Sequence, residues 1–422
     1  MLNLYARQKH HLARRISIVA LAASIQFFSF APANAATGDG HELAGKSWDE
    51  IVAAAKGGEV NWFMWGGSDD INRYVSDFVG SLLKERYDIT LNRVGISDTV
   101  EAVNLVLSEK EAANTDNGSV DLIWINGENF RSMKQGDMAF CGYLDAMPNN
   151  ALIDWDNNSI ANDFGVAVDG CEVPWSKAQF AFAYDEKRTE QPPSTISALI
   201  DWVKENPGRF TYPAPPDFSG SVFVRHVFYH AAGGVDKLLV DFDQTLFDEV
   251  ATKTWKILND MKPALWRAGQ TYPQSVTQLD QMFANSEVDI TFNYDPSSVG
   301  LKIENGSYPE TTKGFVMADG TIGNTSYTLI PFNSPNKAAA VVLQNLLTSE
   351  EAQYQKALPD VWGTIPAIDL SRISDEFKEK FDSLERHPSV VPEAELAEVA
   401  LPELQSSWIT AIEEGWKDNV AR

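Results

Sequence analysis

The chain has 422 residues, 44% of them hydrophobic, so it can bury a large core and is long enough for two or more domains. Its formal net charge is −25, and removal of residues 1–35, which hold four basic and no acidic side chains, would make it −29. So acidic a protein repels nucleic acid and anionic membrane surfaces, and we exclude both as partners.

The N-terminus has the pattern of a secretory signal. Basic residues from Arg7 to Arg15 precede an apolar run over residues 16–30, and Ala33-Asn34-Ala35 is a small-x-small cleavage pattern. A membrane anchor is the alternative, but the run is shorter than the roughly 20 residues that span a bilayer. We expect cleavage near Ala35 and export to the periplasm of a Gram-negative type of cell, with no membrane insertion afterwards.

The two cysteines, Cys141 and Cys171, both fall in the exported part. An oxidising compartment favours a disulfide between them. Two unpaired buried thiols are the alternative, and two cysteines alone do not make a zinc site.

The first half of the exported chain predicts a parallel α/β unit. A short helix over 48–56 ends at Gly57-Gly58, and strands at 60–65, 88–94 and 120–125 alternate with helices at 71–82 and 97–111. About 30 residues separate successive strand starts, which predicts right-handed parallel crossovers. The polar turns after the first and third strands therefore share one sheet edge, where open α/β folds bind ligands.

The second half predicts a similar unit and a return. An extended segment over 173–185 crosses to it, and the return precedes a helix over 336–347 and amphipathic helices to Arg422. Two connections between the units permit hinge closure. The elements expected in between are strands at 209–212, 288–293, 314–317 and 327–331 and helices from the 215–221 turn to Ala232, at 247–262 and at 275–285.

This order of elements resembles the periplasmic solute-binding proteins of ABC importers with the type 2 fold, and in particular the YnjB type, which is related to thiamine, polyamine and iron binders. The residues that carry the resemblance are 60–68, 121–127, 173–185 and, most specifically, Leu329-Ile330-Pro331 through Asn336-Lys337-Ala338 to Ser349-Glu350-Glu351-Ala352-Gln353. It implies an α/β, two-lobed fold with two inter-lobe crossovers and a C-terminal helical region. The expected division is a signal peptide at 1–35, lobe 1 at 41–180 and 322–365, lobe 2 at 181–321, and C-terminal helices at 366–422.

The candidate ligand-binding residues lie on the edges that would meet between the lobes. Each has a second interpretation: the tryptophans can be core, the serines helix caps, Asn126 and Glu128 a solvated turn, and Asp295 before Pro296 a turn former. Two helix N-termini aimed at one gap would also favour an anionic group. The candidates are Trp65, Gly67, Ser68, Asn126, Glu128, Trp175, Gln179, Ser219, Ser221, Tyr294, Asp295 and Tyr327.

Aromatic walls and capped helix starts suggest a small organic solute that bears a ring or a cation, such as a thiamine-like compound. The resemblance implies a monomer that closes on its ligand and delivers it to an inner-membrane ABC permease with its ATPase, without a cofactor, metal site or catalysis. A ferric-ion or polyamine ligand is the alternative within the fold. The return segment 323–327 lacks the carboxylate usual in polyamine binders, and Tyr294 stands alone where ferric-ion binders have adjacent tyrosines.

A secreted hydrolase is the alternative of another class. The sequence has no G-x-S-x-G, H-E-x-x-H or P-loop motif. His226 and His230 have the i, i+4 spacing of metal ligands, but neighbouring Arg225 repels a cation, so a structural role is expected. With 59 acidic residues, paired carboxylates for glycoside chemistry occur by coincidence and carry no signal.

Overall fold

The computed structural model describes residues 38–39 and 43–421. The predicted signal segment and its cleavage at Ala35 therefore lie outside the described residues. Over the described residues, no helix combines the length and apolar character that a membrane span requires.

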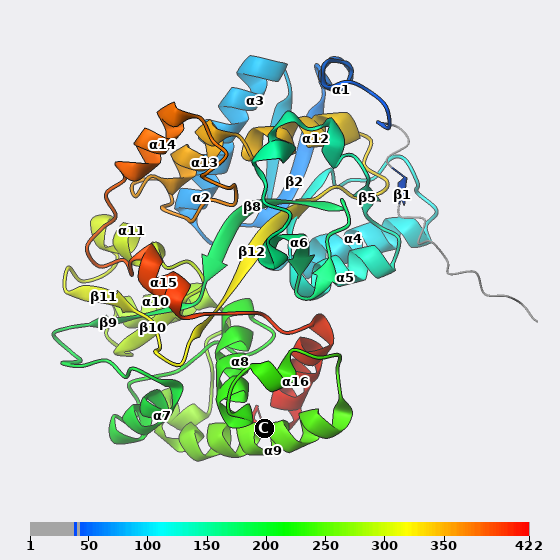
Figure 1. Ribbon diagram of the computed structural model, residues 1–422. Helices are drawn as coiled ribbons and strands as arrows, with labels where there is room; N and C mark the ends of the chain where they lie inside the picture. Colours follow the sequence, from blue (N-terminus) through cyan, green and yellow to red (C-terminus); the bar gives the residue numbers. More distant parts are fainter. Residues whose placement is uncertain (1–37, 40–42, 422) are drawn as a thin grey trace, which may run out of the picture. The chain divides into compact units, whose positions relative to one another are not determined.

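The first sheet has the strand order β13-β12-β4-β2-β3, and β8 pairs with β12. β2 (Glu59–Trp65) runs parallel to β3 (Thr90–Ile96) and to β4 (Leu122–Ile125), as the spacing of the strands predicts. α1 (Trp48–Ala55) and α12 (Lys337–Leu347) pack against one face, and α4 (Val100–Glu111) and α5 (Gly127–Gln135) against the other (Figure 1). The carboxyl ends of β2, β3 and β4 thus lie along one edge.

The predicted helix over 71–82 consists of three segments, because a π-helical stretch, Tyr74–Val79, separates α2 (Asp69–Arg73) from α3 (Gly80–Tyr87). Its first turn is capped by Ser68, whose Oγ accepts a hydrogen bond from the Ile71 N–H at 3.4 Å. π-Helical stretches shift the helix face by one residue. Tyr74 is buried and donates its hydroxyl to the Ala352 carbonyl at 2.8 Å.

Two strands connect the first sheet to the second. β8 (Glu172–Gln179) pairs antiparallel with β12 (Thr321–Leu329) from Glu172↔Leu329 to Gln179↔Gly323, with a bulge between Ser326 and Tyr327. β8 leads into β9 (Ala181–Asp185), the middle strand of the second sheet, and β11 (Thr312–Phe315) precedes β12. The chain therefore passes twice between the sheets, as predicted.

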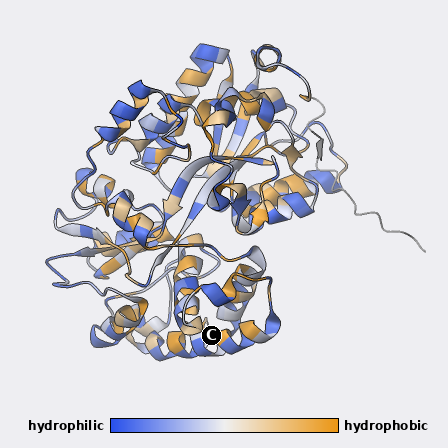
Figure 2. Cartoon of the chain, viewed as in Figure 1, coloured by the Kyte–Doolittle hydropathy of each residue, from blue (hydrophilic) through white to orange (hydrophobic). Residues whose placement is uncertain are grey.

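The second sheet has the order β10-β9-β11, with β10 at Ile290–Asn293. α8 (Phe218–Ala232) is almost wholly buried in the aromatic-rich core, whereas the outer helices carry both hydrophobic and hydrophilic residues (Figure 2). The other helices of this part are α7 (Ile196–Glu205), α9 (Gln244–Met261), α10 (Val276–Ala284) and α11 (Ser298–Glu304). The predicted lobe boundaries stay a prediction.

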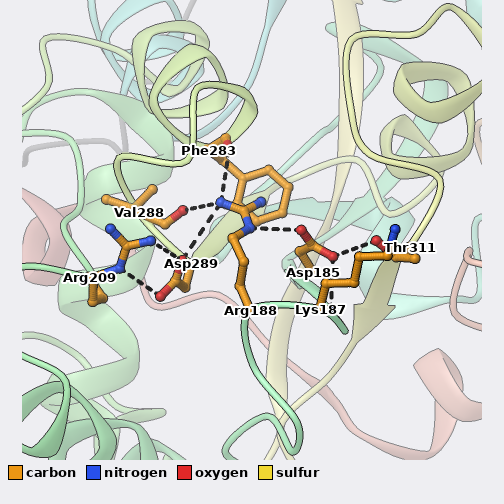
Figure 3. Close-up of polar contacts among 8 residues, drawn as sticks. All are labelled: Asp185, Lys187, Arg188, Arg209, Phe283, Val288, Asp289 and Thr311. Carbon is orange, nitrogen blue, oxygen red and sulfur yellow. Dashed lines mark hydrogen bonds and ion pairs between the residues drawn. The ribbon is translucent and has the colours of Figure 1, made fainter.

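The predicted strand at 209–212 does not form. Its carbonyls at Arg209 and Phe210 accept hydrogen bonds from two different segments, at Asp289 N and Trp266 N, and Pro213 next in the chain has no N–H to extend a ladder. Side chains hold the segment instead (Figure 3): Arg209 and Arg188 both pair with Asp289. Arg188 Nε also lies 2.8 Å from Asp185, at the end of β9.

The C-terminal region is helical, as expected, and adds one strand. α13 (Glu350–Ala357), α14 (Asp375–Asp382) and α15 (Glu393–Glu398) precede β13 (Ala400–Leu401), which runs parallel to the start of β12. α16 (Ser406–Asn419) then packs against α5, α8 and α9. The remaining short elements are β1 (Gly38–Asp39), β5 (Phe140–Cys141), α6 (Asn158–Ala161), β6 (Asn162–Asp163), β7 (Val166–Ala167) and the 3-10 turns Leu144–Ala146, Pro148–Leu152, Asp236–Leu238, Lys262–Ala264 and Trp266–Gly269.

The predicted disulfide between Cys141 and Cys171 is present, across a sequence separation of 30 residues. Its closed loop contains α6, β6 and β7. A cross-link of this length restricts the unfolded chain, and in the chain-entropy account it stabilises the fold by about 3 to 4 kcal/mol.

We therefore expect the double variant Cys141→Ser/Cys171→Ser to unfold at lower urea concentration, with a loss of about 3 kcal/mol in unfolding free energy. Reductant should lower the melting temperature of the wild type and leave that of the double variant unchanged. Equal melting temperatures of the oxidised wild type and the variant would contradict a stabilising bridge.

Candidate functional site

Arg225 lies at the centre of a buried polar cluster on α8. Its side chain is 1% exposed, and its Nη1 donates to Ser221 Oγ at 2.7 Å, one helical turn earlier. Its Nη2 donates to Glu403 Oε1 at 3.0 Å. A buried guanidinium requires such partners because an unpaired charge in the interior costs several kcal/mol.

The carboxylates around Arg225 come partly from the C-terminal region. Glu403, between β13 and α16, also accepts a hydrogen bond from the Tyr294 hydroxyl at 2.8 Å. Glu413, on α16, accepts one from Ser221 Oγ at 2.5 Å. Ser221 thus links Arg225 to Glu413, and Tyr294 fixes Glu403 from the end of β10.

Glu128, which follows β4 of the first sheet, and Phe164, which follows β6 of a separate two-stranded sheet, also approach Arg225. Glu128, in the first turn of α5, is half-buried and interacts electrostatically with Arg225 and Glu403. Phe164, next to β6, lies 6.5 Å from Phe218 between ring centroids, and the Arg225 guanidinium lies 6.0 Å from the Phe164 ring. Groups from both sheets therefore meet at this cluster.

Three glutamates face one arginine here, and burial controls their protonation. Burial raises the pKa of Glu128 and of Glu403, although the Arg225 charge opposes both shifts. Burial raises the pKa of Glu413 to about 7, and the charges of Glu128 and of exposed Asp98 add to the shift. Near pH 7 the Glu413 carboxyl is therefore partly protonated, which lowers the negative charge of the cluster.

Of the two helix N-termini expected to attract an anion, the start of α2 is capped by Ser68 and the start of α8 carries a carboxylate of this chain, as the start of α5 does as well. Asp163 accepts a hydrogen bond from the Gly127 N–H, at the start of α5, at 2.7 Å. Asp217 caps α8 by accepting from the Gly220 N–H at 2.9 Å, and burial raises its pKa to about 6. These two side chains occupy N–H groups that a phosphate or carboxylate would otherwise bind, although burial raises the pKa of Asp163 well above its ordinary value.

Of the predicted ligand-binding residues, the structure brings Glu128, Ser221 and Tyr294 together around Arg225. Ser219 is buried on the first turn of the same helix, and Asn126 is the half-buried N-cap residue of α5. These five positions come from both sheets.

Trp65 and Trp175 belong to a second, aromatic cluster. Trp65 is half-buried, and its ring lies 6.5 Å from that of Trp124, which lies 4.8 Å from Trp175. Trp175 is fully buried against Trp62. Gly67 is exposed, and a Cβ there would come within 2.2 Å of the Trp65 indole, so the glycine leaves room for this ring.

The other predicted residues have partners within the protein. Gln179 donates to Thr321 Oγ1 and to the Leu396 carbonyl, and Tyr327 donates to carbonyls of α6. Asp295 accepts from Trp362 Nε1 at 2.5 Å and from the Ser297 N–H. Ser68 caps α2, as described above.

Sequence reasoning missed Arg225, Glu403 and Glu413 as members of the cluster. Arg225 was noted only as a neighbour of His226, and the C-terminal glutamates are lost among 59 acidic residues. A signal was available in the i, i+4 pair Ser221 and Arg225 on an otherwise apolar helix, which indicates a buried polar network.

His226 has a structural role, as expected. Its Nδ1 lies 2.8 Å from the Val222 carbonyl, and its Nε2 lies 3.0 Å from the Ile322 N–H. Donation from Nδ1–H and acceptance at Nε2 suit the neutral ring, and burial lowers its pKa to about 3. The part of the chain that the structure describes shows no group of three or more His, Cys, Asp or Glu placed to hold a metal ion.

Two surface cavities lie in other parts of the fold. One, of about 370 Å³, lies beside the disulfide and is lined by residues that include Trp155, Asp145 and Asp169. The other, of about 510 Å³, is lined by residues between Pro366 and Glu393. Neither is lined by the residues around Arg225, which pack against one another in this conformation.

Comparison with known proteins agrees with this architecture. The sequence profile of the family described as bacterial extracellular solute-binding protein matches residues 80–382. The chain is also 35% identical to Protein YnjB of Escherichia coli (strain K12) over 369 residues, which cover 87% of this chain and 92% of that protein. The chain belongs to the bacterial extracellular solute-binding protein family.

Solved structures of this fold include binding proteins with different ligands. AfuA from Actinobacillus pleuropneumoniae, with fructose-6-phosphate bound, superposes with a TM-score of 0.60 at 12% identity, covering 86% of this chain and 98% of AfuA. The spermidine/putrescine substrate-binding protein PotD from Streptococcus pneumoniae gives 0.58 at 14% identity, covering 85% and 98%. The expected two-lobed fold is therefore confirmed, and at such identities the likeness concerns the fold alone.

Membership in this family makes the protein an exported substrate-binding component of an ABC transporter. Its homologues bind solutes and are not described as enzymes. Groups from both sheets meet at the polar cluster around Arg225.

Glu413 gives the unliganded protein a measurable pH dependence. Its pKa is about 7 in the folded state against an ordinary value of 4.5, so between these values the folded protein keeps a proton that the unfolded chain has lost. Unfolding free energy should therefore fall as pH rises from about 4.5 to 7, by up to about 3 kcal/mol from this group. Asp217 contributes with the same sign over a lower range, up to about pH 6.

We expect Glu413→Gln to flatten this decline in urea unfolding followed at about pH 5 and pH 7.5. Glu414→Gln, at an exposed neighbouring position, should keep the wild-type slope. An identical pH dependence of the wild type and Glu413→Gln would contradict the assignment.

Proposed function

We propose that this protein captures a small organic solute that bears a ring or a cationic centre, such as a thiamine-like compound. The solute is held between the two sheet-containing parts, and the closed complex delivers it to an inner-membrane permease with its ATPase. No chemistry on the solute is required.

The observation that carries the proposal is the meeting of aromatic and acidic groups from both sheets at one place. Glu128 follows β4 of the first sheet and Phe164 follows β6 of a separate two-stranded sheet, whereas Phe218, Tyr294 and Arg225 belong to the second part. A solute that contacts both sets binds the closed conformation better than the open one, and this difference drives closure. The two crossing strands β8 and β12 are the expected hinge.

The family does not determine the solute, because one fold accommodates different ligands. AfuA has fructose-6-phosphate bound, whereas PotD is named as a spermidine/putrescine substrate-binding protein. A solute with a ring or a cationic centre is proposed because this chain has aromatic rings and carboxylates at the cluster. The N-termini of α5 and α8, which could bind an anion, are instead hydrogen-bonded to Asp163 and Asp217.

A thermal-shift screen of the dialysed protein with vitamins, polyamines, sugars, phosphonates and metal ions tests the proposal. A true ligand at 100 times its dissociation constant should stabilise the protein by about 2.7 kcal/mol. Calorimetry should then show stoichiometric binding, with the solute recovered unchanged. Turnover of a solute would instead support the hydrolase alternative.

Trp65 provides a second test, because it is half-buried whereas Trp175 is core. We expect Trp65→Ala to weaken binding of the identified solute more than tenfold, through loss of an aromatic surface. Trp155→Ala removes another half-buried indole and should leave the affinity unchanged. Wild-type affinity in Trp65→Ala would place the solute elsewhere.

A further inference from the structure

We infer that the cationic group of the solute is an ammonium or amidinium that donates N–H groups to Glu403, with Glu128 and Glu413 around it. The C-terminal segment from β13 to α16 would then form one wall of the binding site. The inference rests on the proposed function and specifies it, since it assigns the charge of the solute and residues that bind it.

An unpartnered acceptor at Glu403 is the first support. The Glu403 side chain is 4% exposed, and its Oε1 receives the hydrogen bonds from Arg225 and Tyr294. Its Oε2 is buried and has no hydrogen-bond partner within the described residues. Buried carboxylate oxygens are rarely left without a donor, so Oε2 marks a position for a donor group from a ligand.

The charge of the cluster is the second support. Glu128, Glu403 and Glu413 interact electrostatically with one another or with Arg225, and Asp98 adds negative charge from the loop after β3. One guanidinium leaves a surplus of carboxylates, which a cationic solute would neutralise. An anionic solute would meet repulsion from the same groups, and the helix N-termini that could offset it are occupied by Asp163 and Asp217.

The placement of the C-terminal segment is the third support. β13 pairs with the start of crossing strand β12, and α16 packs against α5 of the first sheet and α8 of the second. Figure 1 shows α16 beside α8 and α9, with the segment after α15 leading to it. Glu403 and Glu413 therefore reach the cluster from a segment that touches both parts of the fold.

Protonation should be coupled to binding. The groups that face Glu413 are Ser221 and Arg225 on α8, Glu128 on α5 and Asp98 after β3. A cation favours the ionised carboxyl, so binding should become tighter as pH rises through about 7, where Glu413 titrates.

The test uses the full mature protein and three organic cations that carry N–H groups, benzamidine, agmatine and putrescine, beside neutral nicotinamide and anionic fructose 6-phosphate. Calorimetry gives the dissociation constants at pH 6 and pH 8. For any cation that binds, Glu413→Gln should raise the dissociation constant at least tenfold at pH 8 and remove most of its pH dependence. Glu403→Gln should also raise the dissociation constant at least tenfold at pH 8 but keep a pH dependence, because Glu413 is retained. Glu413→Gln keeps the test valid if loss of the Arg225 partner impairs folding.

The matched control is Glu414→Gln, which removes an equal charge from the exposed side of α16 and should leave the dissociation constant within twofold of the wild type. Binding of the neutral or anionic probe without any cation would overturn the inference and leave the proposed solute capture intact. Failure of all three cations to bind, or equal weakening by Glu414→Gln and Glu413→Gln, would also overturn it. Conversion of a probe would overturn the proposed function itself.

Discussion

The buried ion pair between Arg225 and Glu403 is the interaction on which the functional part of this structure depends. It joins α8, at the core of the second sheet, to the C-terminal segment, and Tyr294 joins the same carboxylate from β10. A buried pair of this kind adds little net stability, but loss of one partner costs about 3 to 5 kcal/mol because the other charge remains buried. The pair therefore fixes where the C-terminal segment lies more than how stable the protein is.

Once Arg225 is neutralised by Glu403, the carboxyls of Glu128 and Glu413 have no full counter-charge. Partial burial raises the pKa of both carboxyls, and near pH 7 the Glu413 carboxyl is partly protonated. A solute with a positive charge can replace those protons, whereas a neutral solute cannot. Burial makes an ionised carboxyl unfavourable unless a positive charge pairs with it. Selectivity for a cationic solute therefore arises from the desolvation of these carboxyls.

Local sequence patterns predicted much of the fold. The parallel strands β2, β3 and β4 follow from apolar runs at regular spacing, and the crossing strand β8 from its alternating residues. The strand expected at 209–212 does not form, because Pro213 has no N–H to donate to a neighbouring strand. The apolar pattern of the segment does not reveal this restriction. The site was harder to predict, because its contacts form only when the chain folds. Asp163 and Gly127 are 36 residues apart in the sequence, and Arg225 and Glu403 are 178 apart.

A cation bound at the cluster should displace protons from the partly buried carboxyls around Arg225. Calorimetric titration of a bound organic cation near pH 7, repeated in two buffers of different ionisation enthalpy, measures the protons exchanged on binding. We expect net proton release when the wild type binds the cation, and a smaller release in Glu413→Gln. Proton uptake, or no exchange at all near pH 7, would contradict it.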